Sequence, residues 1–452
     1  GGVASGPVSF MRIFNTATEQ IKQGGKRRGA NMGILRVDHP DILDFINAKQ
    51  VEGEFTNFNL SVGLTEKFME AVEKREDYDL VDPHNGEVVG HLNAGEVFDL
   101  LVKDAWKSGD PGIVFLDRIN EDNPTPLQGQ IESTNPCGEQ PLLPYEACNL
   151  GSINLSLFVI GDALRWGDLK ETVQLAVRFL DNVIDASKYP LPQIGETVRR
   201  NRKIGLGVMG FADMLYQLGI PYDSEEGIAM AEKVMKFIDD VGHEVSQQLA
   251  EERGSFKAFA YSSFPPLGVK ARRNATVTTV APTGTISIIG GCSSGIEPLF
   301  ALSFTRNVMD GQKLTEVNPY FEAALRRQGV YSQAIVDEVA EKGSIQNIDL
   351  PEELKKVFVT AMDIAPLWHV RMQAAFQKHT DNAVSKTVNL PNSATEDDIR
   401  EVYWLAYKEG CKGVTVYRDG CRSLQVLATG EGQKKLDGVQ PAQESPKKKE
   451  RP

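Results

Sequence analysis

The chain has 452 residues, and its 49 Lys and Arg against 62 Asp and Glu give a formal net charge of −13. This length accommodates two to four domains of about 100–200 residues or one large α/β barrel, and a composition of 41% hydrophobic and 25% charged residues argues against a disordered chain. The excess of acidic residues argues against a nucleic-acid scaffold, which needs clustered positive charge. The sequence contains no run of about 18 apolar residues, so it predicts no membrane span.

A 3.6-residue apolar rhythm predicts several helices, and most of them have recognisable ends. Gly109 follows the second predicted helix, at a position where a glycine commonly ends a helix. Asp223 with Glu226 forms the pattern of a capping box at a helix start, and Thr395 and Asp398 open the last helix. The predicted helices are residues 9–22, 98–106, 169–184, 223–254 and 395–410.

Short β-branched runs between these helices predict strands at residues 58–62, 113–116, 276–280 and 414–417. Because the strands alternate with long helices, we expect parallel βα units and an α/β fold.

The composition changes from about Gly430, where Lys, Gln, Pro and Glu replace apolar residues. We interpret this tail as a solvated linker, and the alternative is a basic nucleic-acid arm that includes Lys447–Lys449. The chain begins at Gly1 with neither an initiator Met nor a signal peptide, so we expect it to be a piece of a longer protein.

The cysteines are too few and too widely spaced for a disulfide framework, and no C-x-x-C pair predicts zinc. They are Cys137, Cys148, Cys292, Cys411 and Cys421. Their thiols are therefore candidates for chemistry in an intracellular enzyme or nucleotide-binding protein.

The residues around Cys137 indicate a reactive site in a loop, because Asn135 lies two residues before it and Glu139 two residues after it. In an extended or looped segment these three side chains project to the same side, so a thiol, a carboxylate base and an amide donor converge on one substrate atom. Pro136 and Gly138 suit a tight loop. The alternative is that Cys137 is an inert loop cysteine. Cys148 lies in a strand-like run, and its position alone indicates a buried core thiol.

Two further loops have the composition of phosphate-binding segments. Pro282–Thr285 follows the predicted strand 276–280 and offers hydroxyls, a glycine and backbone N–H groups, which make either an anion nest or an ordinary turn. Residues 23–30 place three cations among three glycines after the first helix, which makes either a polyphosphate-binding loop or a solvated basic turn.

Taken together, these stretches resemble the adenosylcobalamin-dependent (class II) ribonucleotide reductase family. The matching stretches are residues 1–49, 135–155, 201–215, 279–300 and 410–420. The resemblance covers residues 1–428 in order and implies a ten-stranded α/β barrel of two antiparallel five-stranded halves, with its N-terminal strands truncated and a central finger loop near 135–139. Residues 429–452 then form a flexible polar linker.

The resemblance also implies residue roles. Cys137 matches the cysteine that becomes a thiyl radical and abstracts the ribose 3′ hydrogen, and Glu139 matches the carboxylate that takes the 3′-hydroxyl proton. Asn135 matches the amide at the 2′ and 3′ hydroxyls, and Cys148 matches one of two thiols that reduce the substrate.

Substrate and effector contacts follow from the same resemblance. The substrate-binding matches are Gly2, Asn135, Pro136, Cys137, Gly138, Glu139, Pro282, Thr283, Gly284, Thr285 and Ile286. The matches in the effector loop are Lys22, Gln23 and Arg27.

The implied reaction reduces a ribonucleoside diphosphate or triphosphate to its 2′-deoxy form, with adenosylcobalamin as cofactor, a deoxynucleotide effector and a thioredoxin-type or dithiol reductant. Paired thiols supply the acid and the electrons, a carboxylate supplies the base, and the cofactor generates the radical. The resemblance further implies a cytoplasmic monomer or homodimer that binds neither nucleic acid nor membrane.

Some features depart from the family pattern. The thiol partner of Cys148 is expected upstream of Gly1, and the family's C-terminal cysteine pair is expected beyond the tail. Asp82–His84 begins like a cobalt-ligating D-x-H-x-x-G motif, but position 87 is Glu, so we interpret His84 as a loop residue and predict no metal ligand. Cys292, Cys411 and Cys421 have no assigned role.

Rival interpretations stay open. A class I large subunit shares the barrel but passes its radical through consecutive tyrosines, where this chain offers Tyr417 alone. A glycyl-radical reductase needs a C-terminal glycyl loop. A catalytically inactive nucleotide-binding regulator would need neither Cys137 nor Cys148.

Because the partner thiol is expected upstream of Gly1, we predict that the purified chain does not turn over repeatedly. Product formation with adenosylcobalamin and an external dithiol measures this, and multiple turnovers per chain would contradict the expectation.

Overall fold

The computed structural model describes residues 5–23, 27–51, 53–307 and 313–421. These residues divide into two compact units. The larger unit runs up to Pro298 and resumes at Ile364, and the smaller unit spans Leu299–Asp363.

A five-stranded sheet forms the centre of one half of the larger unit, in the order β16-β17-β7-β4-β3. The strands β3, β4 and β7 are parallel, β17 runs antiparallel to β7, and β16 runs parallel to β17. Their bounds are β3 Asn31–Arg36, β4 Phe58–Leu64, β7 Gly112–Phe115, β16 Thr387–Leu390 and β17 Gly413–Arg418. The predicted strands 58–62, 113–116 and 414–417 are confirmed, except that Leu116 already begins a helix.

Amphipathic helices bury their apolar stripes against this sheet. Phe98 and Leu101 from α4 (Ala94–Ser108) and Tyr403 from α15 (Glu396–Lys408) join Val62 of β4 in one continuous core. The predicted end of the first of these helices is confirmed, because Gly109 takes a left-handed conformation there. The predicted start of the last helix is confirmed as well, and Thr395 and Asp398 form a capping box there. The other helices of this half are α1 Gly6–Gln20, α2 Ile42–Ile46, α3 Glu66–Lys74, α5 Leu116–Glu121 and α14 Pro366–Gln377.

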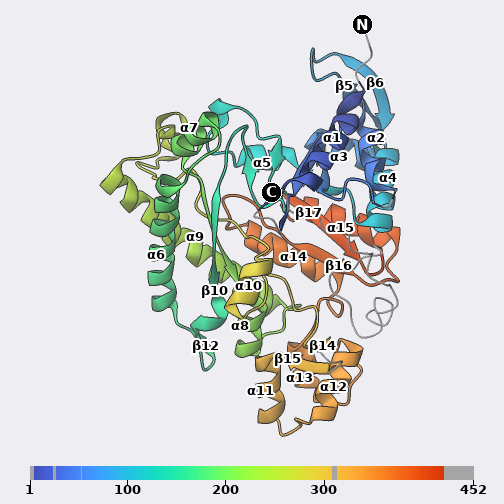
Figure 1. Ribbon diagram of the computed structural model, residues 1–452, viewed down its shortest axis with the longest axis vertical. Helices are drawn as coiled ribbons and strands as arrows, with labels where there is room; N and C mark the ends of the chain where they lie inside the picture. The colour runs from blue at the N-terminus through green and yellow to red at the C-terminus, as the bar shows by residue number, and fades with distance from the viewer. Residues whose placement is uncertain (1–4, 24–26, 52, 308–312, 422–452) are drawn as a thin grey trace, which may run out of the picture. The chain divides into compact units, whose positions relative to one another are not determined.

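A second parallel pair is formed by β10 (Asn149–Asn154) and β13 (Ile204–Met209). The long helix α6 (Trp166–Ala186) covers this pair, and α9 (Glu225–Arg253) lies beside α6 (Figure 1). The predicted helix 169–184 is confirmed. The start of α9 differs by one residue from the predicted start, because the N-cap is Ser224 and not Asp223. The Ser224 hydroxyl accepts a hydrogen bond from the Gly227 amide at 3.0 Å.

The remaining elements of the larger unit are short. They are β1 Lys22–Gln23, β2 Arg27–Arg28, β5 Asp77–Val81, β6 Val88–Asn93, β8 Ser133–Thr134, β9 Pro141–Leu142, β11 Val159–Ile160, β12 Ala163–Leu164, α7 Pro192–Asn201, α8 Phe211–Leu218 and α10 Gly284–Gly290.

The predicted strand 276–280 is wrong as a regular strand, because it forms only isolated bridges at Thr278 and Val280. A side chain takes two of its backbone amides, since Val277 and Thr278 both donate to the Asp381 carboxylate, while the Thr279 and Val280 amides donate to backbone carbonyls. The segment passes so close to β13 that a Cβ on Gly207 would lie 2.0 Å from the Thr279 carbonyl oxygen. Only glycine allows this approach.

The smaller unit pairs β14 (Ser303–Asn307) with β15 (Lys313–Val317) in an antiparallel arrangement. Its helices are α11 Pro319–Arg327, α12 Gln333–Lys342 and α13 Glu352–Val357. None of the predicted site residues lies in this unit.

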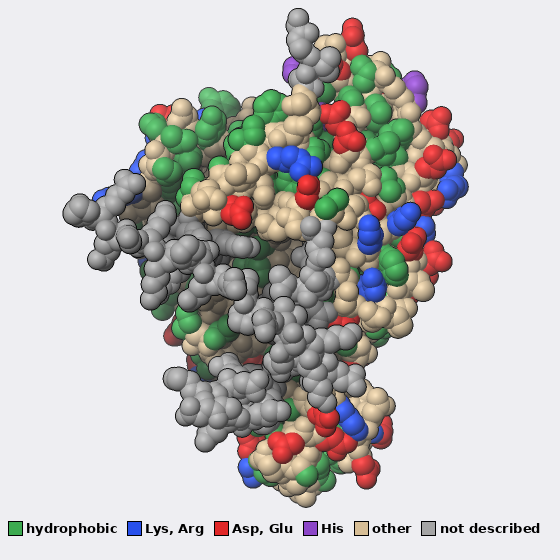
Figure 2. Space-filling model, turned by 45° about the vertical axis from the view of Figure 1, so that its right-hand side comes forward, with side chains coloured by type: hydrophobic (Ala, Val, Ile, Leu, Met, Phe, Trp, Pro, Cys, Tyr) green, Lys and Arg blue, Asp and Glu red, His purple; other side chains and the backbone are tan. Residues whose placement is uncertain are grey.

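Charge is mixed over the molecular surface. On the face drawn in Figure 2, acidic and basic side chains are interspersed rather than gathered by sign. Ion pairs such as Asp99 with Arg75 and Arg400 account for part of this mixing. None of the helices that the structure describes has the length and apolar character needed to cross a membrane.

A buried charge cluster ties α6 to the segment after α9. The Asp181 side chain is 0% exposed and accepts bonds from Arg202 at 2.9 Å, Arg253 at 3.1 Å, Arg273 at 3.3 Å and Asn274 at 3.1 Å. Removing the carboxylate leaves several cations without their counter-charge.

We therefore expect Asp181→Ala to lower the free energy of unfolding by about 3–5 kcal/mol. Asp240→Ala is the control, because its exposed pair with Lys236 is worth less than about 1 kcal/mol. Urea unfolding measures both variants, and equal losses would contradict the assignment of Asp181 as a buried charge anchor.

Candidate active site

The segment Asn135–Gln140 forms a tight turn between the short antiparallel strands β8 and β9. The Asn135 amide donates to the Gln140 carbonyl at 3.1 Å, and the Gln140 amide donates back to the Asn135 side chain at 3.0 Å. Gly138 takes a φ of +84°, a conformation that glycine adopts without strain. Asn135 thus closes the turn with its own side chain.

The tip of this turn faces a cavity of about 310 Å³. Pro136, Cys137 and Gly138 line it, together with residues of β4, β7 and β17. Asn59 of β4 donates to the Pro136 carbonyl at 2.6 Å, which holds the tip against the sheet. The Cys137 side chain is exposed, so its thiol is accessible at the cavity.

Glu139 points away from solvent and is 2% exposed. Its carbonyl oxygen accepts from the Thr279 hydroxyl at 2.8 Å and from the Ala383 amide at 3.0 Å. Burial raises the pKa of the carboxyl group, and a hydrogen bond from Asn135 opposes this shift. The carboxylate oxygen Oε2 is buried and has no hydrogen-bond partner among the described residues.

Cys148 stands just before β10, and its thiol donates to the Asn149 carbonyl at 3.4 Å. Asn149 pairs with Ile204 across the parallel strands, so Cys148 and Lys203 occupy adjacent positions. Burial raises the pKa of Cys148, and the Lys203 charge opposes the shift while nearby carboxylates add to it. The group is therefore a neutral thiol that can donate a proton and electrons.

Sequence reasoning missed the buried ion pair beside this thiol. Lys203 Nζ lies 2.7 Å from Glu146 Oε2, and both side chains are almost fully buried. Asn201 donates to the other Glu146 oxygen at 2.7 Å. A lysine at the start of an apolar run is a sequence signal for a buried charge, but nothing in one sequence identifies its partner 57 positions earlier.

The predicted phosphate loop contributes to the same cavity through Pro282. Thr283 takes a left-handed conformation with φ +56°, and its hydroxyl accepts from the Gly295 amide at 2.7 Å. The following Gly284, Thr285 and Ile286 are exposed on α10. The structure therefore brings one end of this loop to the cavity that Cys137 lines.

The remaining predicted site residues are described only in part. Gly2 lies outside the described residues. Lys22 and Gln23 belong to β1 and Arg27 to β2, where Gln23 and Arg27 are paired, but their side chains lie outside the described part. Their roles stay predictions.

His84 lies in the turn between β5 and β6 with a side chain 92% exposed. Its ring nitrogen Nδ1 is 3.2 Å from Asp82, and it gathers no further ligand. Among the unassigned cysteines, burial raises the pKa of Cys411 to about 12 and that of Cys292 to about 11. These thiols are poor nucleophiles.

One group of side chains in the structure has the spacing of metal ligands, although no metal ligand was predicted from the sequence. Asp239, His243 and Asp381 place their ligand atoms within 4.8 Å of one another. His243 Nε2 lies 3.0 Å from Asp381, and the Thr278 hydroxyl donates to Asp239 at 2.7 Å. Hydrogen bonds within the group and from Thr278 engage each of these side chains, and the group joins residues 138 positions apart, which sequence spacing does not show.

Comparisons with known proteins agree with this geometry. The family model described as ribonucleotide reductase, barrel domain, matches residues 1–266 and 268–417. The structure is similar to the class Id ribonucleotide reductase alpha subunit of Actinobacillus ureae, with a TM-score of 0.74 at 24% identity over 92% of this chain and 75% of the other.

The chain therefore belongs to the ribonucleotide reductase barrel-domain family, and the predicted family and barrel-type fold are confirmed. It is 55% identical over 96% of its length to the vitamin B12-dependent ribonucleoside-diphosphate reductase of Thermoplasma acidophilum. It is 53% identical over 95% of its length to the protein of the same name from Mycobacterium tuberculosis. The chain spans 57% and 62% of the length of these two relatives.

The burial of Glu139 predicts a pH-dependent cost in stability. A carboxyl whose pKa is raised on folding binds its proton more tightly in the folded state, so wild-type stability falls as pH rises above the ordinary carboxyl pKa of about 4.3. Glu139→Gln removes this titration and should gain stability over the wild type as pH rises. Urea unfolding at pH 4.5 and 7.5 measures the difference, and a variant that loses stability relative to wild type with rising pH would contradict it.

Proposed function

We propose that this chain is the catalytic barrel of an adenosylcobalamin-dependent reductase that converts ribonucleoside diphosphates to 2′-deoxyribonucleoside diphosphates. The observation that carries the proposal is the turn at 135–140, which exposes Cys137 in a cavity and buries Glu139 two residues later. The relatives at 55% and 53% identity are named for this activity and this vitamin.

Each residue of the turn has a role in this reaction. Cys137, as a thiyl radical, takes the 3′ hydrogen of the ribose and returns it at the end. Glu139 accepts the 3′-hydroxyl proton, and its raised pKa suits it to hold that proton. Asn135 binds the hydroxyl region with the side chain that also closes the turn.

Cys148 supplies a proton and an electron to the substrate, and a second thiol supplies the other proton and electron. The balance is one ribonucleotide and two thiols giving one deoxyribonucleotide, one disulfide and one water. Cys148 suits this role because burial keeps it protonated until it reacts. The five cysteines of the described part form no disulfide, and the second thiol is placed upstream of Gly1 because the family resemblance implies that position.

The cofactor assignment depends on which residue the radical reaches. Bound adenosylcobalamin would supply the radical chemistry that converts a thiol to a thiyl radical. The exposed Cys137 fits this requirement, because an accessible thiol at a cavity is open to a large cofactor. His84 does not fit a cobalt ligand, since it points into solvent from a hairpin turn.

The same proposal includes the regulatory and redox partners. A deoxynucleotide effector would bind near Lys22, Gln23 and Arg27, whose cations and flanking glycines match polyphosphate chemistry. A thioredoxin-type or dithiol reductant would restore the thiols, in a cytoplasmic monomer or homodimer.

Replacing Cys137 tests the proposal directly. Mixing the chain with adenosylcobalamin, a deoxynucleotide and a ribonucleoside diphosphate should change the visible absorbance of the cofactor as it is cleaved. Cys137→Ala should slow this change by roughly three orders of magnitude or more, because the hydrogen donor is gone.

Cys421→Ser is the matched control, since that thiol has no assigned role, and it should react at the wild-type rate. Nucleotide binding by Cys137→Ala should persist, which separates lost chemistry from lost folding. Full cofactor cleavage by Cys137→Ala would contradict the radical assignment, and nucleotide binding without any cleavage by the wild type would favour a regulator.

A further inference from the structure

The five-stranded sheet carries polar side chains on the face that meets the active-site turn. Side chains alternate between the two faces of a strand, so Leu60 and Val62 of β4 point into the core that the helices cover. Asn59 and Ser61 alternate with them and point the other way. On this second face the Asn59 side chain donates to the Pro136 carbonyl of the turn. The Ser61 side of β4 therefore faces the active-site turn.

Strand pairing places three hydroxyl side chains in one line across this face. Ser61 of β4 pairs with Gly112 of β7. The register of β17 against β7 brings Thr415 beside Gly112, and Thr387 of β16 pairs with Thr415. The five strands contain no other serine or threonine. These three residues, which we call the hydroxyl row, all line the cavity of Cys137.

Gly112 puts no side chain between two members of the row. A Cβ on Gly112 would lie 3.1 Å from Ser61 Oγ and 3.5 Å from Thr415 Oγ1, so both hydroxyls flank bare backbone. Ser61 is 7% exposed and Thr415 is exposed, and neither hydroxyl has a hydrogen-bond partner among the described residues. A buried hydroxyl without a partner calls for a polar group in the cavity. Glycine at position 112 lets such a group approach.

The charges around the row favour an uncharged polar group. Among the described residues that line the cavity, Lys386 is the one cation, and its side chain is 0% exposed. Its ammonium lies 2.7 Å from Glu297, 3.0 Å from His369 and 3.0 Å from the Thr387 carbonyl, which uses all three donors. The lining also includes the acidic residue Asp110. A phosphate at the row would find no available cation in this lining, whereas a hydroxyl group, which both donates and accepts, needs none.

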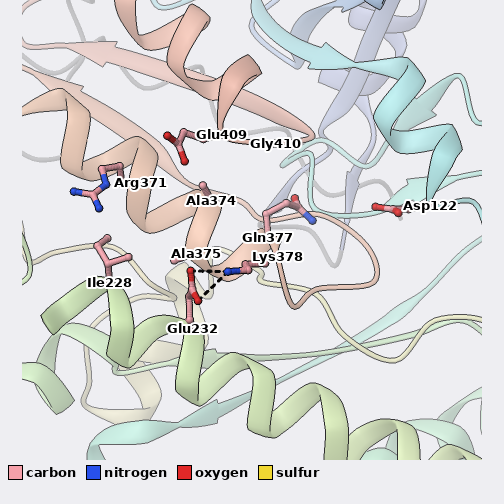
Figure 3. A pocket seen from close by; sticks show the side chains of 10 residues that line it. All are labelled: Asp122, Ile228, Glu232, Arg371, Ala374, Ala375, Gln377, Lys378, Glu409 and Gly410. Atoms are coloured by element: carbon pink, nitrogen blue, oxygen red, sulfur yellow. Dashed lines mark hydrogen bonds and ion pairs between the residues drawn. The ribbon is translucent and has the colours of Figure 1, made fainter. Parts of the chain in front are cut away.

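A second cavity of the same unit, of about 440 Å³, has charged walls (Figure 3). Lys378 of α14 lies 3.1 Å from Glu232 of α9 within it, and Arg371 lies 2.6 Å from Glu225. Its two cations are thus already paired, and its described lining includes neither Cys137 nor a member of the hydroxyl row. We use it as the comparison cavity for binding experiments.

The chemistry of the proposed reaction identifies the ligand group. Cys137 lines the same cavity as the row and acts on a ribose in the proposed function. The two ligands that approach this thiol, a ribonucleotide and the adenosyl group of the cofactor, each carry a ribose with neighbouring 2′ and 3′ hydroxyls. We propose that Ser61 and Thr415 bind the sugar hydroxyls of a nucleoside in the Cys137 cavity; this inference rests on the proposed function.

Binding of nucleosides and nucleotides to the 452-residue chain tests the proposal. Calorimetric titration gives the affinities for two pairs of probes: a ribonucleoside diphosphate with its 2′,3′-dideoxy analogue, and 5′-deoxyadenosine with its 2′,3′-dideoxy analogue. The ratio of affinities within a pair measures recognition of the sugar hydroxyls. Ser61→Ala combined with Thr415→Val should reduce this ratio in at least one pair, by roughly three- to tenfold for each hydrogen bond lost. A reduction in the diphosphate pair assigns the row to the substrate, and a reduction in the adenosine pair assigns it to the adenosyl group.

Three further variants separate recognition from packing. Thr415→Ser keeps the hydroxyl and should retain the wild-type ratio. Thr172→Val removes a hydroxyl of α6 that does not line this cavity, and Lys378→Gln alters the comparison cavity, so both should leave the ratio unchanged. If Thr415→Ser reduces the ratio as far as Thr415→Val alone does, Thr415 only supports the wall, and the proposal is overturned. A ratio that falls with Lys378→Gln would place the sugar in the comparison cavity and also overturn it.

The remaining outcomes are distinguishable. A wild-type chain that binds no ribonucleoside diphosphate would overturn the proposed function and this inference together. A wild-type chain that binds each dideoxy analogue as tightly as its parent compound would overturn the inference alone, as would a double variant whose two ratios equal those of the wild type.

Discussion

The active-site geometry depends on how the carbonyl of Glu139 is held. The Thr279 hydroxyl and the Ala383 amide both donate to it, which fixes one arm of the turn that carries Cys137. Thr279 reaches this position because Gly207 offers no side chain to keep it away. The hydrogen bond from Asn59 to Pro136 holds the other arm. A reactive thiol is thereby presented at a cavity by a short loop with few degrees of freedom.

The electrostatics of the site follow from this constraint. Because the turn is held inside the unit, the Glu139 carboxylate is removed from water, and one of its oxygens has no hydrogen-bond partner among the described residues. This burial costs stability and raises the pKa of Glu139. Cys148 is kept neutral by burial, beside the saturated pair of Lys203 and Glu146. Strain of this kind is common at functional sites, where groups are set for reaction rather than for stability.

Periodicity and capping patterns predicted the long helices and three of the four strands, because these signals are local. The start of α9 moved from Asp223 to Ser224, since either residue satisfies the cap pattern and only tertiary context selects one. The segment 276–280 is irregular because the Asp381 carboxylate, about a hundred positions later, takes two of its amide bonds. The family and the cysteine turn were readable from motifs, whereas the partner of Lys203 and the alignment of Ser61 with Thr415 depend on distant segments.

The central claim is that Cys137 removes the 3′ hydrogen of a ribonucleotide. The rate at which a ribonucleoside diphosphate carrying deuterium at the 3′ position is consumed in the presence of adenosylcobalamin tests it most directly. The account predicts slower reaction with the 3′-deuterated nucleotide than with the unlabelled one, and no comparable slowing with a 2′-deuterated nucleotide. Equal rates for the 3′-deuterated and unlabelled nucleotides, with slowing by 2′ deuteration instead, would contradict it.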